Sequence, residues 1–307
     1  MRNRQLPALV LLGLTILILT QLAGATENGG TPYPNGAETV LPAVAPTPKM
    51  LLLQDFQMFY SANRFNDSRG RNSIPNFRVT VFAQAYKFKY NWGVKFLGGY
   101  VYSAVSPVLT YQQLEAAGAQ QTKFNMANND IEPVFINYTK GSLHWQYGLD
   151  IWTPGPTYKA SDMVNIGQHY WEFEPVYAIT WLPNKGKTEL SSRIHYGTDT
   201  TNGDTHYHSG DYFNAEFNAC RTLKKNVTLG FNGYWMRQVR DDTIHGQRVG
   251  DGNQTKDLGL GPELRAPVGK SAVIAFKYFR DTHAQNHAVG NAFWFELGVP
   301  VFKGEQR

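Results

Sequence analysis

From residue 50 onward, hydrophobic and polar residues alternate with a period of two, which is the spacing of a β-strand with one apolar face. In residues 143–151 (LHWQYGLDI) every odd position is apolar or aromatic and every even position is polar or Gly. Residues 171–181 and 293–301 repeat this arrangement, with aromatic side chains on the apolar face. The body of the chain is therefore predicted to be all-β.

Twelve segments carry this alternation, and most of them are longer than the ordinary strand of about 5–6 residues. They reach the roughly 9–11 residues that a tilted strand needs to cross a bilayer. Their expected spans are 50–61, 77–88, 93–106, 130–139, 142–153, 169–182, 187–198, 209–221, 225–239, 254–266, 270–282 and 289–302.

Tight and mostly long connections alternate between these segments. The tight ones are 89–92, 140–141, 183–186, 222–224 and 267–269, and the others are 62–76, 107–129, 154–168, 199–208, 240–253 and 283–288. An even strand number with short turns at one end and longer loops at the other is typical of an outer-membrane barrel. Because lipid cannot hydrogen-bond an exposed sheet edge, the sheet must close. We therefore predict a 12-stranded antiparallel up-and-down transmembrane β-barrel; the alternative, a soluble sandwich, predicts shorter strands and no such asymmetry of turns.

The first 49 residues differ from the rest. Residues 1–25 have two Arg, an apolar stretch over 6–19 and a small-residue AGA site, which is the pattern of a cleaved secretory signal peptide; an uncleaved anchor would need a longer apolar run. Residues 26–49 are rich in Pro and Gly and cannot form a continuous helix or a central strand. We expect a flexible segment there, either a periplasmic tether or a plug of the barrel, which itself occupies residues 50–307.

Composition excludes several classes of function. The net charge is +5, of which two units lie in the signal peptide, so the mature chain is too weakly basic to indicate a nucleic-acid partner. One Cys excludes an intramolecular disulfide and any multi-cysteine metal site. The pair His206 and His208 and the calcium-loop-like stretch 251–257 are weak metal signals, since the stretch lacks a Glu at the twelfth position. No cofactor and no metal site are expected.

The polar faces of the strands predict what lines the lumen, which should be narrow in a barrel of this size. The interpretation assigns Asp55, Gln57 and Gln84 to the lumen, together with aromatic side chains that could stack on an apolar ligand, namely Phe82, Tyr86 and Tyr234. The residues expected in the middle layer carry both charges: Asp150, Glu174, Arg193, Glu216 and Lys277. They either form a salt-bridge network that fills the barrel or line a substrate path.

The longest connection, residues 107–129, is rich in good helix formers between positions 111 and 121. A short helix that caps the mouth of the barrel or folds into it is the expectation for this segment. An exposed loop without a specific role is the alternative.

Three short stretches carry a resemblance to a known family: residues 26–30 (TENGG), 33–38 (YPNGAE) and 60–67 (YSANRFND). They resemble the MetA-pathway of phenol degradation family, which includes sphingosine-induced outer-membrane proteins. The resemblance implies a barrel in the bacterial outer membrane that takes up hydrophobic or aromatic small molecules, either phenol-pathway-type substrates or long-chain lipids. Its implied partners are outer-membrane lipid, the apolar solute and, during biogenesis, the barrel-assembly machinery.

Two other functions are compatible with the sequence. One is a non-conducting structural or surface barrel. The other is an outer-membrane lipid hydrolase, although His208 and Ser209 form the only His–Ser adjacency and neighbouring strand residues point to opposite faces. No nucleophile elbow is present and the family supplies no catalytic residues, so we do not expect an enzyme.

Overall fold

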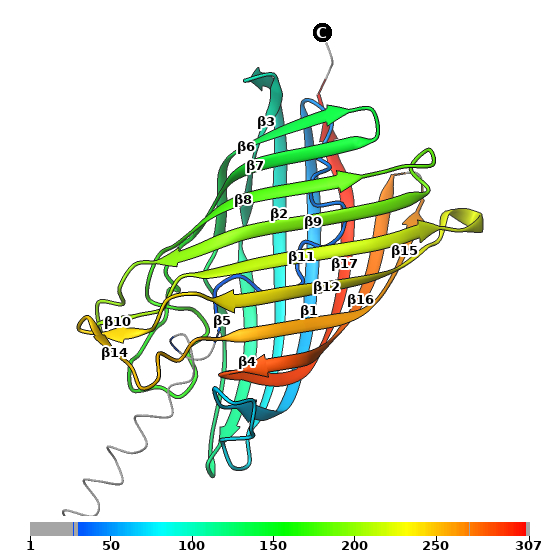
Figure 1. Cartoon of the computed structure of the whole chain (residues 1–307). Coiled ribbons are helices and arrows are strands. Elements are labelled where there is room, and N and C mark those ends of the chain that lie inside the picture. The colour runs from blue at the N-terminus through cyan, green and yellow to red at the C-terminus, as the bar shows by residue number, and fades with distance from the viewer. Residues whose placement is uncertain (1–26, 28–29, 270, 305–307) are drawn as a thin grey trace, which may run out of the picture.

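The chain folds into a closed antiparallel β-barrel in the computed structural model, which describes residues 27, 30–269 and 271–304 (Figure 1). The predicted signal peptide lies outside the described residues. The wall consists of β1 (Met50–Asn66), β2 (Arg78–Phe96), β3 (Gly99–Ser106), β4 (Val108–Ala116), β5 (Ala119–Met126), β6 (Asp130–Lys140), β7 (Leu143–Trp152), β8 (Glu172–Trp181), β9 (Thr188–Asp199), β11 (Tyr212–Thr222), β12 (Thr228–Gln238), β15 (Lys256–Val268), β16 (Ala272–Gln285) and β17 (His287–Lys303).

These fourteen segments build a twelve-stranded barrel because two of its strands are interrupted. β3 and β4 pair with successive parts of β2 and are separated only by Pro107, which cannot donate to the ladder. β6 and β5 pair with β3 and β4 in turn. β1 pairs with both β2 and β17, which closes the ring. The predicted fold class is confirmed.

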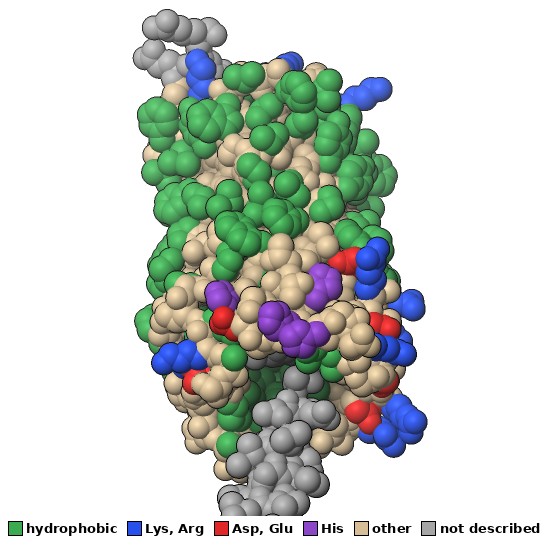
Figure 2. All heavy atoms as spheres, turned by 90° about the vertical axis from the view of Figure 1, so that its left-hand side faces the viewer, with side chains coloured by type: hydrophobic (Ala, Val, Ile, Leu, Met, Phe, Trp, Pro, Cys, Tyr) green, Lys and Arg blue, Asp and Glu red, His purple; other side chains and the backbone are tan. Residues whose placement is uncertain are grey.

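The outside of the barrel is apolar over the part that faces lipid. Phe231, Trp235, Leu264, Phe276 and Phe293 are among the large hydrophobic side chains exposed there. Figure 2 shows hydrophobic side chains over the upper part of one face, with some Lys and Arg side chains at its upper edge, and acidic, basic and His side chains lower down. A closed sheet satisfies its own backbone hydrogen bonds, so this surface can sit in hydrocarbon.

Within the described part of the chain, no helix is long and apolar enough to cross a membrane.

The connections between the wall strands lie at two opposite ends of the barrel. The end with short turns contains the turns after β6, β8, β11 and β15, and we call it the periplasmic end; the opposite end, with the loops 153–171, 200–211 and 239–255, is the outer end. The outer loops contain the small sheet of β10 (Tyr207–His208), β13 (Thr243–Ile244) and β14 (Gln247–Arg248). All wall strands therefore run between these two ends.

One predicted turn, residues 89–92, is wrong. β2 continues through it, and the chain reverses at Leu97 and Gly98, whose φ angles of 49° and 86° suit a two-residue hairpin. The reason is that Lys87, Lys89 and Asn91 are buried on the inner face, so the alternation continues without a break. Lys89 and Asn91 suggest a turn because such residues are common in solvent-exposed turns, but here both are buried inside the barrel.

The predicted helix within residues 107–129 is also wrong. This segment contains β4 and β5, joined by a tight turn at Ala117 and Gly118. β4 pairs with β2 from Arg78↔Glu115 to Ala85↔Val108, and this pairing overrides the helix propensity of its Gln, Leu and Ala residues.

Candidate functional site in the barrel lumen

The N-terminal segment, of which residues 27 and 30–49 are described, lies inside the barrel. At the outer end the Glu27 carboxylate accepts hydrogen bonds from Tyr158 (2.6 Å), Asn202 (2.6 Å) and Thr205 (2.8 Å), all in outer loops. Burial and this hydrogen bond raise the pKa of the Tyr158 hydroxyl. At the other end the Lys49 amide donates to the Asn91 carbonyl at 2.8 Å, next to the start of β1. The segment therefore spans the lumen from end to end.

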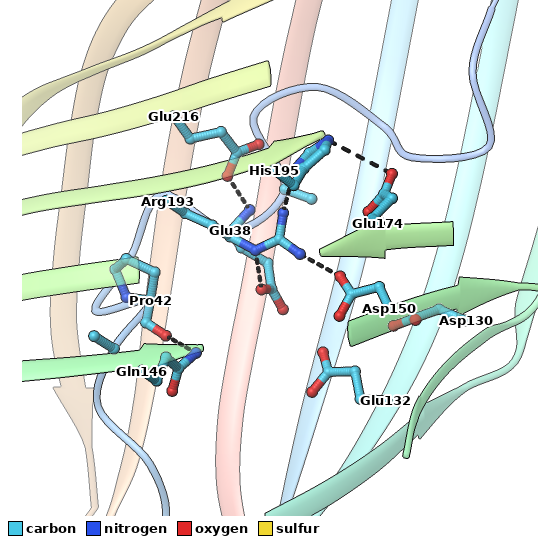
Figure 3. A network of polar contacts seen from close by, with 12 residues as sticks. Glu38, Pro42, Asp130, Glu132, Gln146, Asp150, Glu174, Arg193, His195 and Glu216 are labelled. Atoms are coloured by element: carbon cyan, nitrogen blue, oxygen red, sulfur yellow. Dashed lines mark hydrogen bonds and ion pairs between the residues drawn. The ribbon is translucent and has the colours of Figure 1, made fainter. Parts of the chain in front are cut away.

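Arg193 of β9 lies at the centre of the contacts between this segment and the wall (Figure 3). Its guanidinium pairs with Asp150 of β7, and its Nε lies 3.0 Å from Glu38 Oε2 in the segment. It also donates to His195 Nδ1 at 2.7 Å and packs over the Tyr33 ring, 4.7 Å from its centroid. A buried guanidinium is tolerated when carboxylates and ring faces surround it in this way.

A second buried cation holds the same glutamate. Lys87 of β2 pairs with Glu38 and with Glu132 of β6, and its Nζ lies 3.6 Å from Asp130. Glu38 therefore joins two cations from opposite parts of the wall, since β2 and β9 are not neighbours. The segment is fixed at this point by charges that would be costly to leave unpaired.

A third contact holds the backbone of the segment. Glu216 of β11 accepts hydrogen bonds from the amides of Gly36 (2.7 Å) and Glu38 (2.9 Å). Lys277 of β16 donates to the carbonyls of Gly36 (2.6 Å) and Ala37 (2.9 Å) and pairs with Glu296. Gly36 has φ of +86° and a Cβ there would lie 2.8 Å from the Phe279 ring, so only Gly fits this bend.

The structure therefore brings together four of the five charged residues predicted for the middle layer, because Asp150, Arg193, Glu216 and Lys277 all hold the segment directly or through one another. The fifth, Glu174, is also buried, and it accepts from Tyr212 at 2.8 Å beside His195. Tyr234 is buried and donates to Asp281 at 2.5 Å. That these residues line a substrate path stays a prediction.

The placement of Phe82 in the lumen is wrong, because its side chain faces outward and is 40% exposed. Asp55, Gln57, Gln84 and Tyr86 alternate with the residues that line the lumen and lie on the same outer face. There Gln57 and Gln84 donate to Asp55 at 3.2 Å each. Between residues 79 and 85 the inner face of β2 is instead apolar, which reverses the polarity that barrel strands normally show.

This apolar wall lines a cavity of about 830 Å³. Its lining on β1, β2 and β4 includes Phe56, Met58, Val79, Val81, Ala83, Ala85, Val108 and Leu114. The N-terminal segment and the loop 153–171 form the other side, with Tyr33, Trp152 and Ile166. Sequence reasoning missed this site because it assumed a polar lumen all round; the runs of small and branched apolar residues at odd positions of 79–85 are the signal that could have identified it.

A second cavity, of about 220 Å³, lies further along the same segment, beside residues 40–46. Its wall includes Leu52, Val273 and Ala275. Both cavities are lined by Ala37, Glu38 and Phe56, so these three residues separate them. The lumen thus has a polar part that anchors the segment and a hollow part beside it. The wall of the hollow part on β1, β2 and β4 is mainly apolar, and its lining also includes the anchoring residues Glu38, Lys87 and Asp150.

Two other kinds of site were considered, a metal site and a hydrolase site. Among the described residues, no group of three or more His, Cys, Asp or Glu side chains is arranged to hold a metal ion. Ser209, considered above for a hydrolase, has its hydroxyl oxygen 3.3 Å from the Glu27 amide, which donates to it.

Comparisons with known proteins agree with this architecture. The model of the MetA-pathway of phenol degradation family matches residues 62–297. No curated protein matches the sequence significantly. An outer membrane channel from Pseudomonas putida F1 superposes with a TM-score of 0.73 at 10% identity, covering 87% of this chain and 99% of that one.

Two further solved structures are less similar. The transport unit of the autotransporter AIDA-I from Escherichia coli has a TM-score of 0.47 at 10% identity and covers 85% of this chain and 93% of its own. A FadL homologue from Pseudomonas aeruginosa has a TM-score of 0.40 at 9% identity, with coverage of 91% and 97%. The closed barrel and its apolar exterior place this chain in the bacterial outer membrane, as predicted.

Proposed function

We propose a transport function for this chain, which belongs to the MetA-pathway of phenol degradation family: it is a channel through which hydrophobic or aromatic small molecules enter the cell. The observation that carries the proposal is the cavity of about 830 Å³ between the apolar wall of β1, β2 and β4 and the N-terminal segment. Its volume lies within the roughly 300–1,000 Å³ of small-molecule sites, and such sites are mostly apolar.

The path runs from the outer end, past the apolar wall, to the constriction formed by Ala37, Glu38 and Phe56, and then into the smaller cavity. A hydrophilic solute beside this wall loses water molecules and finds few hydrogen-bond partners on β1, β2 and β4 to replace them, so its transfer there is unfavourable. A hydrophobic solute gains about 25 cal/mol for each Å² of apolar surface that it buries. The wall therefore selects solutes that water and the lipopolysaccharide layer exclude.

Uptake by whole cells tests the proposal. A strain without this chain is complemented with the wild type or with Met58→Gln/Val81→Thr, which introduces polar groups of nearly the same size into the cavity. The matched control is Met58→Leu, which keeps the wall apolar. We expect the initial uptake rate of radiolabelled naphthalene to fall several-fold for the polar variant, because an unpaired buried amide or hydroxyl costs roughly 1–3 kcal/mol, and to stay unchanged for the control.

Two results would overturn the proposal. In one, the strain without the chain accumulates naphthalene as fast as the complemented strain, which is the outcome expected of a purely structural barrel. In the other, proteoliposomes containing the wild type admit arabinose at the rate of a general porin.

A further inference from the structure

Two cations face each other on the outside of the barrel. Arg237 at the end of β12 and Lys256 at the start of β15 are direct partners in the register of these strands. Both alternate with buried neighbours, Met236 and Gln238 on one strand and Asp257 on the other, so both point away from the lumen. Side chains directly opposite each other on one face are about 5 Å apart at Cβ, and like charges in that position repel.

The two cations lie at the outer border of the apolar band. One step toward the periplasmic end, the outward pair is Trp235 and Leu258. From there the outward positions of β15 continue as Leu258, Leu260, Pro262, Leu264, Ala266 and Val268. This run matches the length of a tilted membrane strand, so Arg237 and Lys256 lie at the level of the lipid headgroups in the outer leaflet.

No acidic side chain of the described part of the chain pairs with either cation. Two carboxylates at this end of the barrel have other partners: Asp211, which is buried, pairs with Arg240 at 3.0 Å, and Asp241 pairs with Arg248 at 2.9 Å. The side chain of Arg240, three residues after Arg237, is 73% exposed and adds a further cation at this end of the barrel. The repulsion between Arg237 and Lys256 is therefore not relieved from within the molecule, whereas an anion between them would relieve it.

We propose that Arg237 and Lys256 form a binding site for a phosphate group of the glycolipid in the outer leaflet, lipopolysaccharide. A guanidinium can donate two parallel hydrogen bonds to a phosphate, and a neighbouring ammonium adds a third donor. Cations next to the hydrocarbon boundary attract anionic lipids in the same way at other membrane surfaces. Trp235 and Leu258, directly below, supply an apolar surface for the acyl chains of the same lipid.

A titration of the purified protein with lipopolysaccharide, followed by native mass spectrometry, tests this site. The protein is expressed as the full-length chain and extracted from outer membranes. We expect Arg237→Gln/Lys256→Gln to weaken binding by about tenfold or more, since it removes both phosphate donors. Arg237→Lys/Lys256→Arg keeps both charges and should bind nearly as well as the wild type. The matched control is Arg221→Gln, because Arg221 is an exposed cation on the outer face at the periplasmic end of β11.

Folding of each variant is verified by its heat-dependent gel mobility. A second measurement, with enzymatically dephosphorylated lipopolysaccharide and the wild type, needs no variant, and we expect it to lower the affinity by a similar factor. Equal binding by the wild type and the double Gln variant would overturn the proposal, and so would equal binding of the phosphorylated and dephosphorylated lipids. An effect of Arg221→Gln as large as that of the double variant would do the same, because it would show attraction by overall charge.

Discussion

Replacing Arg193 by Gln should both destabilise the barrel and release the N-terminal segment. The Arg193 and Asp150 side chains are each only 1% exposed, and Arg193 also contacts Glu38 and the Tyr33 ring. Removing one member of a buried pair typically costs 3–5 kcal/mol. Lys87 still neutralises part of the charge on Glu38, so we expect a loss of about 3 kcal/mol, near the lower end of that range.

A double-mutant cycle separates the pair from other effects of the substitution. Asp150→Asn alone removes the carboxylate, and Arg193→Gln/Asp150→Asn removes both charges together. Because the double variant leaves no unpaired charge at this position, it should be less destabilised than the sum of the single variants by about 1–3 kcal/mol. Urea unfolding of the purified protein, followed by tryptophan fluorescence, gives the four free energies of unfolding.

Single-channel conductance gives an independent readout. The contact of Arg193 with Glu38 holds the segment in the polar part of the lumen. Arg193→Gln should therefore raise the conductance without changing the apolar wall. Additive free energies in the cycle together with an unaltered conductance would refute the reasoning. They would mean that these contacts neither stabilise the barrel nor fix the segment.

Three further predictions follow from other parts of the structure. Phe56→Ala should join the two cavities, raise naphthalene uptake and cost about 3 kcal/mol of unfolding free energy, as measured by uptake and urea titration; unchanged uptake would contradict a constriction there. Asp55→Leu should stabilise the barrel in bilayers by about 1–2 kcal/mol, because a carboxylate on the lipid face is unfavourable; a destabilised variant would show that its contacts with Gln57 and Gln84 dominate. The hydrogen bond from Lys123 lowers the pKa of Asp162 in the outer loop. This contact should therefore persist above the unfolded pKa of about 3.9 and be lost as pH falls through the lower folded value. The protection of loop 153–171 against hydrogen exchange, relative to the intrinsic exchange rate at each pH, should therefore fall in the wild type as the pH is lowered below the unfolded pKa, but not in Asp162→Asn.

The strand number and the closed barrel could be predicted from the sequence because period-two alternation and the order of short and long connections are local properties. The same local reasoning predicts that Arg193, Asp150, Glu216 and Lys277 lie together inside the barrel, since residues of both charges recur at inner positions of several strands. Which carboxylate pairs with which cation depends on register and on the path of residues 30–49, and neither follows from alternation.

Two of the errors, the lumen placement on β2 and the helix within residues 107–129, have a common physical origin. Over residues 79–85 of β2 the inner face is apolar and the outer face carries polar side chains, so a rule that places polar residues inside assigns Phe82 and Gln84 to the wrong side. Between residues 107 and 129 the helix propensity of the chain is outweighed by pairing with β2 and by the cavity that β4 lines. Both errors fall on the wall of the apolar cavity, where the requirements of the site override the usual pattern of a barrel strand.

The location of a bound hydrophobic molecule tests the central claim most directly. Crystals of the protein soaked with 1-bromonaphthalene and measured at the bromine absorption edge should show an anomalous peak inside the barrel, against Met58 and Val81. Bromine peaks confined to the lipid-facing exterior, with none between the N-terminal segment and the wall of β1, β2 and β4, would contradict the account.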